Sequence, residues 1–438
     1  YNVNGLRNSH MANISDGANS FDPACNCGSA VTANVDMTQE VKIQTSNFSA
    51  ENPLGPTVFN AVSKSGTAQY HGEAYLYARH SALNSRDWRN NFFQTKKPED
   101  SFYFPGFNLG GPLTKSRAKL FFFAGVEFMR QNHDLGVRPA IVPTEAMRKG
   151  DFSDTAYLSA LNGYDVNTMP RNDAEGSSNW GGRPLTADML QGGRLDPAYF
   201  DKGGSILLNL LPLPNQDPTK SGGYNYTSNV INPEHRHQQL GRVDYNISDN
   251  TKLYTRFNHE YHSQPFPFTL WWHNPNEVPW PGDLHGSYNT WSSSTSLVHV
   301  LDPSTTNEVV FAVTRWTMPH TVRQMEKVSR KELGYPYRGI FKNTTDIVPN
   351  FTDWGGGVPA FIQPGGLDDP GFYGNKLVID LREDFTKVSG THTMKFGFFY
   401  EHVATDQPAY GNDQGQITPT NWGGNSTGNA FADLLLGR

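Results

Sequence analysis

This 438-residue sequence has little cysteine, little charge and no long apolar run. Its two cysteines, Cys25 and Cys27, cannot form a disulfide framework, and a C-x-C pair is too short for a four-ligand zinc site. The simpler interpretation is that both cysteines lie in a loop and have no redox or metal-binding role. Charged residues make up 18% and the net charge is −6, so the basic surface that binds nucleic acid is missing and no such partner is expected. No apolar stretch approaches the ~18 residues of a membrane-spanning helix.

Motifs for catalysis and for cofactors are missing as well. The sequence has no Ser-His-Asp pattern, P-loop or dinucleotide fingerprint, so we expect neither an enzyme nor a bound cofactor. His235 and His237 lack a third metal ligand at a suitable spacing and are interpreted as a surface pair. The adjacent acids at 368–369 and at 383–384 would point to opposite faces of a strand, which does not suit a glycosidase.

The sequence is instead rich in aromatic residues (13%), with 42 glycines and 29 prolines, and in segments that alternate between two kinds of residue. This period of two predicts β-strands, because successive side chains of a strand point to opposite faces. We expect nine strands, most of about ten residues, which suits a tilted strand that crosses a bilayer. They cover 70–79, 107–113, 119–131, 238–246, 251–261, 290–301, 306–316, 376–387 and 392–402.

Short and long connections alternate between these strands. Tight polar turns are expected at 114–117, 247–250, 302–305 and 388–391, and long loops at 80–106, 132–237, 262–289 and 317–375. Long loops without structure are uncommon in compact soluble domains, whereas transmembrane barrels combine short periplasmic turns with long extracellular loops. The pattern therefore predicts an all-β protein with an antiparallel transmembrane β-barrel. The 132–237 loop is long enough for short helices, at 145–148 and 205–211.

One face of each strand is polar, and in a barrel that face lines the lumen. A charged side chain on the lipid face would cost ~2–4 kcal/mol for Arg or Lys at the midplane. A solvated interior is the simpler interpretation of these residues, and a lining that selects cargo is the alternative. The candidate lumen-facing residues are Arg242, Asp244, Arg256, Glu260, Asp380, Arg382, Lys395 and Glu401.

The long loops contain aromatic residues beside turn formers. Such rings can bind sugars by stacking, but the simpler interpretation is that they pack the loops together or lie at the membrane interface. The candidate contacts are Trp88, Trp180, Trp271, Trp272 and Trp354.

Residues 1–69 are small, polar and rich in asparagine, without strands of bilayer length. Asp16-Gly17 is a turn signal, and short strands are expected near 40–45 and 58–66. This segment predicts a compact element that precedes the barrel. Because the sequence starts and stops inside apparent structural elements, we expect it to be a piece of a longer protein.

Short motifs follow one another in a fixed order along the chain. They lie at 3–7 with 16–17, 39–45, 47–51, 58–67, 70–73, 109–112 before 120–123, 142–144 with 150–152, 211–215, 242–244 with 248–250, 395–397 and 431–437. In this order they resemble TonB-dependent outer-membrane receptors, and most of all the Oar-like group that is common in Acidobacteria. The resemblance spans essentially the whole chain, and its strength lies in the order of motifs that are individually weak.

The resemblance implies that residues 1–69 are the C-terminal part of a plug domain, and that residues 70–438 are the N-terminal part of a barrel, about nine of 22 strands. It implies a location in the bacterial outer membrane, lipid contact and import of a scarce cargo such as an oligosaccharide or a siderophore. It also implies energy from the TonB complex, through a segment that this chain lacks. Two alternatives stay open: a secreted or surface carbohydrate-binding protein, and a passive porin or adhesin.

Overall fold

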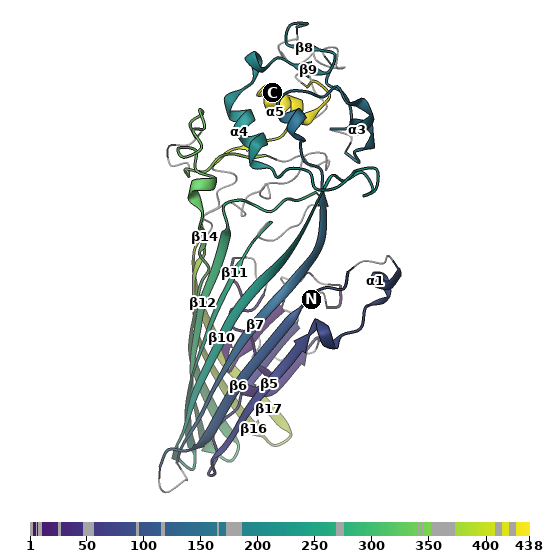
Figure 1. The fold of residues 1–438 in the computed structure, drawn as a ribbon. Helices are drawn as coiled ribbons and strands as arrows, with labels where there is room; N and C mark the ends of the chain where they lie inside the picture. The colour runs from purple at the N-terminus through teal and green to yellow at the C-terminus, as the bar shows by residue number, and fades with distance from the viewer. Residues whose placement is uncertain are drawn as a thin grey trace.

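The computed structural model describes residues 3–5, 7, 11–24, 28–46, 57–92, 96–114, 119–163, 166–171, 186–268, 276–339, 342, 345–351, 373–407, 414–419 and 426–438. A large curved antiparallel sheet dominates it (Figure 1). Its main strands are β5 (His71–His80), β6 (Ser101–Pro112), β7 (Leu120–Ala140), β10 (Tyr226–Ser248), β11 (Thr251–Pro265), β12 (Leu284–Asp302), β13 (Thr305–Thr317), β16 (Asn375–Ser389) and β17 (His392–Asp406).

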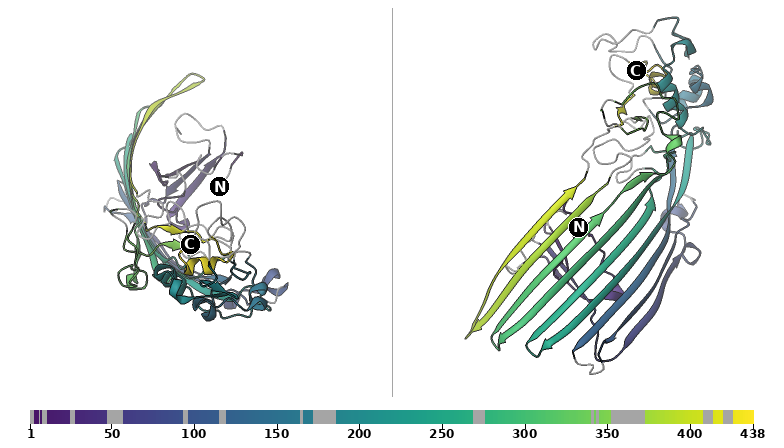
Figure 2. Two further views of the ribbon diagram at one scale, coloured as in Figure 1. Left: turned by 90° about the horizontal axis from the view of Figure 1, so that it is seen from above. Right: turned by 90° about the vertical axis from the view of Figure 1, so that its left-hand side faces the viewer.

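The nine main strands lie side by side in chain order, from β5 at one edge to β17 at the other, and the short strand β14 (His320–Val322) pairs with β12. Each main strand is antiparallel to its neighbour. The prediction of nine antiparallel strands in an all-β fold is thus confirmed. Among the described residues β5 and β17 do not pair with each other, so the sheet is open (Figure 2).

Several strands are longer than their sequence pattern predicts. β7 has 21 residues and β10 has 23, and the two pair from Tyr226 opposite Ala140 down to Tyr245 opposite Leu120. The connections therefore cover 81–100, 141–225, 266–283 and 318–374, so the longer spans expected at 80–106, 132–237, 262–289 and 317–375 are wrong in their bounds. The sequence pattern does not reveal this extra length, because Gly136 and Pro233 interrupt the alternation. The backbone pairing between the two strands nevertheless continues past both residues.

The two faces of the large sheet differ in polarity. On the convex face, apolar side chains are exposed, including Phe257 and Phe311, each 50% exposed. On the concave face, polar side chains are buried, including Arg256 at 1% exposure and the serines at 292, 294 and 296 at 0%. This distribution is the opposite of that in a water-soluble sheet, which buries apolar side chains and exposes polar ones.

A small four-stranded sheet covers part of the concave face (Figure 2). It is formed, in spatial order, by β2 (Ala18–Asn19), β1 (Met11–Ser15), β4 (Thr57–Ser63) and β3 (Thr38–Gln44). The expected turn is present: Asp16 and Gly17 both have positive φ, 46° and 81°, which suits a two-residue β-hairpin. The hairpin places β2 against β12, β13 and β16 of the large sheet.

The described parts of the connections 141–225, 266–283 and 318–374, with the described residues from 414 on, fold into a separate body at one end of the sheet, which we call the cap (Figure 1). It holds the largest apolar core of the described residues, with side chains from 140–211, 266–284, 318–351 and 430–435. The helices expected at 145–148 and 205–211 are present, as α2 and α4. The cap contains α2 (Glu145–Arg148), α3 (Thr155–Ala160), α4 (Lys202–Leu210), α5 (Ala430–Leu435), β8 (Leu190–Gln191), β9 (Arg194–Leu195), β15 (Asn350–Phe351) and β18 (Gln416–Ile417).

Helices α4 and α5 pack closely because Gly204, in the first turn of α4, has no side chain. A Cβ atom at Gly204 would lie 1.7 Å from the carbonyl oxygen of Leu434, so a larger residue would separate the helices. Asp201 caps α4 by accepting a hydrogen bond from the Gly204 amide at 2.6 Å, and its own amide donates to the Leu435 carbonyl. No helix in the described part of the chain has the length and apolar character to span a membrane.

Candidate functional site

The contact between the small sheet and the concave face is built around Asp16, at the tip of the β1–β2 hairpin. Its carboxylate lies 3.1 Å from Arg256 Nε and 3.3 Å from Arg242 Nη1, and the Asp16 side chain is 1% exposed. Arg256 also donates to the Ser15 carbonyl at 2.5 Å. Since a buried carboxylate is stable only with partners of opposite charge, two arginines of the large sheet fix the position of this tip.

Arg242 links the same tip to two further groups. It makes a two-point contact with Asp244, at 2.8–3.1 Å, and donates to the carbonyl and hydroxyl of Ser63, at the end of β4. Its guanidinium lies 4.2 Å from the centre of the Tyr254 ring. These contacts engage all three nitrogens of the guanidinium, so they fix its orientation.

The other side of the hairpin contacts carboxyl groups instead of arginines. The Asn19 amide donates to Asp380 Oδ2 at 2.8 Å, and Asn19 Nδ2 donates to Glu401 Oε2 at 2.5 Å. Thr314 on β13 donates to the Asn19 carbonyl at 3.0 Å. Next along the chain, Asp22 forms a buried ion pair with Lys376 at 2.5 Å.

A further carboxylate supports the chain between β2 and β3. Glu260 accepts a hydrogen bond from the Thr32 amide at 3.0 Å and lies 3.5 Å from Arg236 Nη1. Gln238, on the neighbouring strand, donates to the Thr32 carbonyl at 2.6 Å. The small sheet is therefore held at several points along the curved face.

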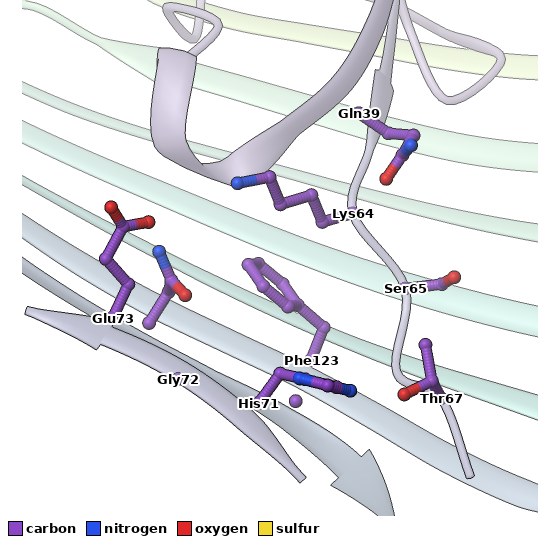
Figure 3. Close-up of a pocket in the computed structure, with 10 residues that line it drawn as sticks. Gln39, Lys64, Ser65, Thr67, His71, Gly72, Glu73 and Phe123 are labelled. Atoms are coloured by element: carbon purple, nitrogen blue, oxygen red, sulfur yellow. The ribbon is translucent and has the colours of Figure 1, made fainter. Parts of the chain in front are cut away.

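Arg382 and Lys395 line a polar pocket of about 250 Å³ between the small sheet and strands β13, β16 and β17. Lys42 and Asn60 face it from the small sheet, and Arg382 forms an ion pair with Asp384 at 2.8 Å. A second pocket of about 310 Å³ lies where the chain leaves the small sheet and enters β5 (Figure 3). Gln39, Lys64, Glu73 and Phe123 are among the residues that line it.

The structure thus brings the eight candidate lumen-facing residues to one face. The expectation that water surrounds them is wrong for Arg256 and Asp380, which are 1% and 2% exposed, because the small sheet covers them. Four partners were missed: Asp16 was interpreted only as a turn residue, and Asn19, Asp22 and Thr32 carried no signal. Only their contacts across the two sheets, more than 200 residues apart in sequence, identify them.

Of the five predicted aromatic contacts, Trp88 lies among the described residues. Trp88 lies in α1 (Trp88–Phe92), is 74% exposed and stacks on Phe92 with ring centres 5.0 Å apart. The remaining candidates, and both cysteines, lie outside the described residues: Trp180, Trp271, Trp272, Trp354, Cys25 and Cys27. Within the described ranges no group of three or more His, Cys, Asp or Glu residues could hold a metal ion.

The sequence model of a family described as "Outer membrane beta barrel domain" matches residues 62–438. The chain therefore belongs to this family of bacterial outer-membrane proteins. No curated protein matches the chain.

Solved structures with a similar arrangement include the outer membrane transporter YddB from Escherichia coli, at 10% identity and a TM-score of 0.46, covering 92% of this chain and 41% of that one. The ferric-catecholate import receptor Fiu from E. coli, in its open form, has 12% identity and a TM-score of 0.41, covering 92% and 54%. FpvA from P. aeruginosa, bound to heterologous pyoverdines, has 12% identity and a TM-score of 0.41, covering 91% and 47%. The chain spans about half the length of these structures, and similarity at this level does not bear on cargo.

Proposed function

We propose that this chain belongs to a TonB-dependent outer-membrane transporter of the Oar-like group, which imports a scarce cargo. Residues 1–69 are the C-terminal part of its plug, and residues 70–438 are the N-terminal part of its barrel. The eight charged residues of the concave face line the lumen, the apolar convex face contacts lipid, and the cap lies outside the cell. The chain has no catalytic role.

The observation that carries this proposal is the small sheet seated on the polar face of a barrel-type sheet. Asp16 enters a buried site between Arg242 and Arg256. An open porin or an adhesin has no need for an element that covers its lumen wall, whereas a transporter that opens only when energised does. The ordered motifs, from 39–45 through 431–437, support the TonB-dependent class in particular.

The cargo class stays open between glycans and iron chelates. The exposed Trp88–Phe92 stack on α1 supports a glycan, since aromatic faces bind sugar rings. A surface carbohydrate-binding protein would use the same stack, and it differs from a transporter in having no dependence on cellular energy.

Growth of a strain that carries the full-length gene tests the proposal directly. The strain is grown with and without its TonB complex on a panel of iron chelates and glycans, beside a strain without the gene. We expect gene-dependent growth on at least one cargo, lost without TonB. Gene-dependent growth that persists without TonB would favour a passive porin, and glycan binding by cells without any gene-dependent growth would favour a surface binding protein.

The orientation is tested on intact cells. Protease added outside should cleave within 141–225, and cleavage only after rupture of the outer membrane would reverse the topology. Spin labels at Lys395 and Glu401 should report water or protein contact, while a label at Phe257 should report lipid. The opposite pattern would reject the assignment of the faces.

A further inference from the structure

The β1–β2 hairpin meets the large sheet through two chemically different contacts. On one side, Asp16 lies between two arginines. On the other, Asn19 donates to two carboxyl groups, those of Asp380 and Glu401. The first contact balances its charge, whereas the second brings two acids together.

The two acids are direct cross-strand neighbours. Asp380 on β16 lies opposite Glu401 on β17, both on the concave face, and Asn19 donates to the carboxyl groups of both. Asp380 is 2% exposed, and its Oδ1 atom has no hydrogen-bond donor among the described residues. Two ionised carboxylates side by side in a buried site repel each other, so one shared proton stabilises the arrangement.

In the part of the chain that the structure describes, the cations nearest this pair are engaged by other acids. Arg382, on the same face of β16, forms an ion pair with Asp384 at 2.8 Å, and Lys376 forms one with Asp22 at 2.5 Å. On β13 the residue opposite Asp380 is Ala312. In the hairpin, Asp16 is itself an acid and is held by its arginines. Within the described part of the chain, neither Asp380 nor Glu401 takes part in a salt bridge.

We propose that Asp380 and Glu401 form a proton-binding pair that holds the β1–β2 hairpin against the sheet through Asn19. With one shared proton the pair carries a single negative charge, and both donors of Asn19 are satisfied. When the pH rises and this proton is lost, two like charges in a buried site repel each other, and the hairpin contact weakens. The arginine contact at Asp16 does not change over the same range, so the hairpin loosens from the Asn19 side only.

Amide hydrogen exchange of the full chain in detergent micelles tests this proposal, because the Asn19 amide itself donates to Asp380. Exchange is followed from about pH 5 to about pH 9 and corrected for the intrinsic dependence of the rate on pH. We expect protection of the Asn19 amide to fall roughly tenfold as the pH rises, since a change of one proton at a buried pair commonly shifts local equilibria by this much. The Ser15 segment beside the arginines should keep its protection.

Two variants remove the shared proton in different ways. In Asp380→Asn and in Glu401→Gln one partner is permanently neutral, so the Asn19 protection should become independent of pH; if one variant fails to fold, the other answers the question. Glu260→Gln is the matched control, because Glu260 also accepts a hydrogen bond from a backbone amide, that of Thr32, but has Arg236 beside it. This variant should keep the wild-type pH dependence at Asn19.

Three results would overturn the proposal. They are wild-type protection that stays constant with pH, variants that keep the pH dependence, and protection at high pH that is restored by adding Ca²⁺ or Mg²⁺, which would make the pair a metal site. If the hairpin is part of a plug, its loosening would help to open the transporter, and this part of the inference rests on the proposed function. The exchange measurement does not, so it can succeed even if the growth experiment fails.

Discussion

The large sheet and the cap solve opposite packing problems within one chain. The cap buries leucine, phenylalanine and valine side chains in a continuous core, as a water-soluble domain does. The large sheet exposes such residues on its convex face and buries arginine, aspartate and serine on its concave face. The difference shows that the surrounding solvent decides which side chains are exposed. Apolar side chains are exposed on the convex face, where lipid is the solvent, and polar ones on the outside of the cap, where water is.

The two regions also differ in what keeps them together. Apolar packing stabilises the cap, whereas ion pairs and hydrogen bonds connect the small sheet to the large one. Apolar packing tolerates many substitutions at moderate cost, while a buried charge without its partner is costly. The comparison therefore predicts different sensitivities in the two regions.

The largest effect is expected at the buried ion pairs. Asp16→Ala leaves Arg256 buried without its carboxylate, which should weaken the contact between the two sheets by about 3–5 kcal/mol. Amide exchange of β1 in the full chain measures this as loss of protection. Asp244→Asn is the control, because the Asp244 side chain is 21% exposed and its ion pair is with Arg242, so β1 should stay protected. An equal loss of β1 protection in both variants would contradict the prediction that Asp16 holds the two sheets together.

In the cap, Leu207→Ala creates a cavity beside α5 and should destabilise the cap by about 2–5 kcal/mol. Limited proteolysis within 141–225 measures the change, and the strands of the large sheet should remain resistant. Lys149→Ala removes only the exposed pair with Glu145, so it should not alter cleavage. Cleavage of the strands together with the cap would show that the two regions do not unfold separately.

On the convex face, Phe257→Arg places a charge in the apolar band and should cost ~2–4 kcal/mol if this face meets the bilayer midplane. Urea unfolding from liposomes measures the loss. His235→Arg, on the same face and nearer the cap, should cost roughly 0–1 kcal/mol because it lies toward the interface. A harmless Phe257→Arg would mean that the convex face does not contact lipid.

The smallest effect concerns Asp433, which lies in α5 at 1% exposure and accepts hydrogen bonds from Ser426 and the Thr427 amide. Burial raises the pKa of Asp433 to about 6. The unfolded value is about 4, so this group favours the folded cap most below about pH 4 and loses that contribution as the pH rises through about 6.

Protease resistance of the cap from about pH 4 to about pH 7 measures this loss. Asp433→Asn should flatten the profile, whereas Asp217→Asn, at an exposed position, should leave it unchanged. If the protease resistance of the wild-type cap increased with pH, the prediction that the cap loses stability as Asp433 ionises would be wrong.

The sequence predicts the strands well because their period of two reflects local geometry. Residues 251–261 carry Arg256 and Phe257 on opposite faces in both the pattern and the structure. It predicts strand ends poorly where a proline or glycine interrupts the pattern, as at Pro233, since hydrogen bonding to β7 maintains the strand there. The core of the cap could not be predicted, because it joins α4 to residues more than 200 positions later.

The sequence by itself determined the all-β class, the alternation of short and long connections and the polar face that carries Arg242, Arg256, Asp380 and Glu401. These follow from rules that act over a few residues. Only the tertiary structure decided that Asp16 sits between two arginines while Asn19 meets two acids. The physical reason is that buried charges take their partners from whichever strand lies opposite in space, and that choice leaves no trace in the spacing of residues along the chain.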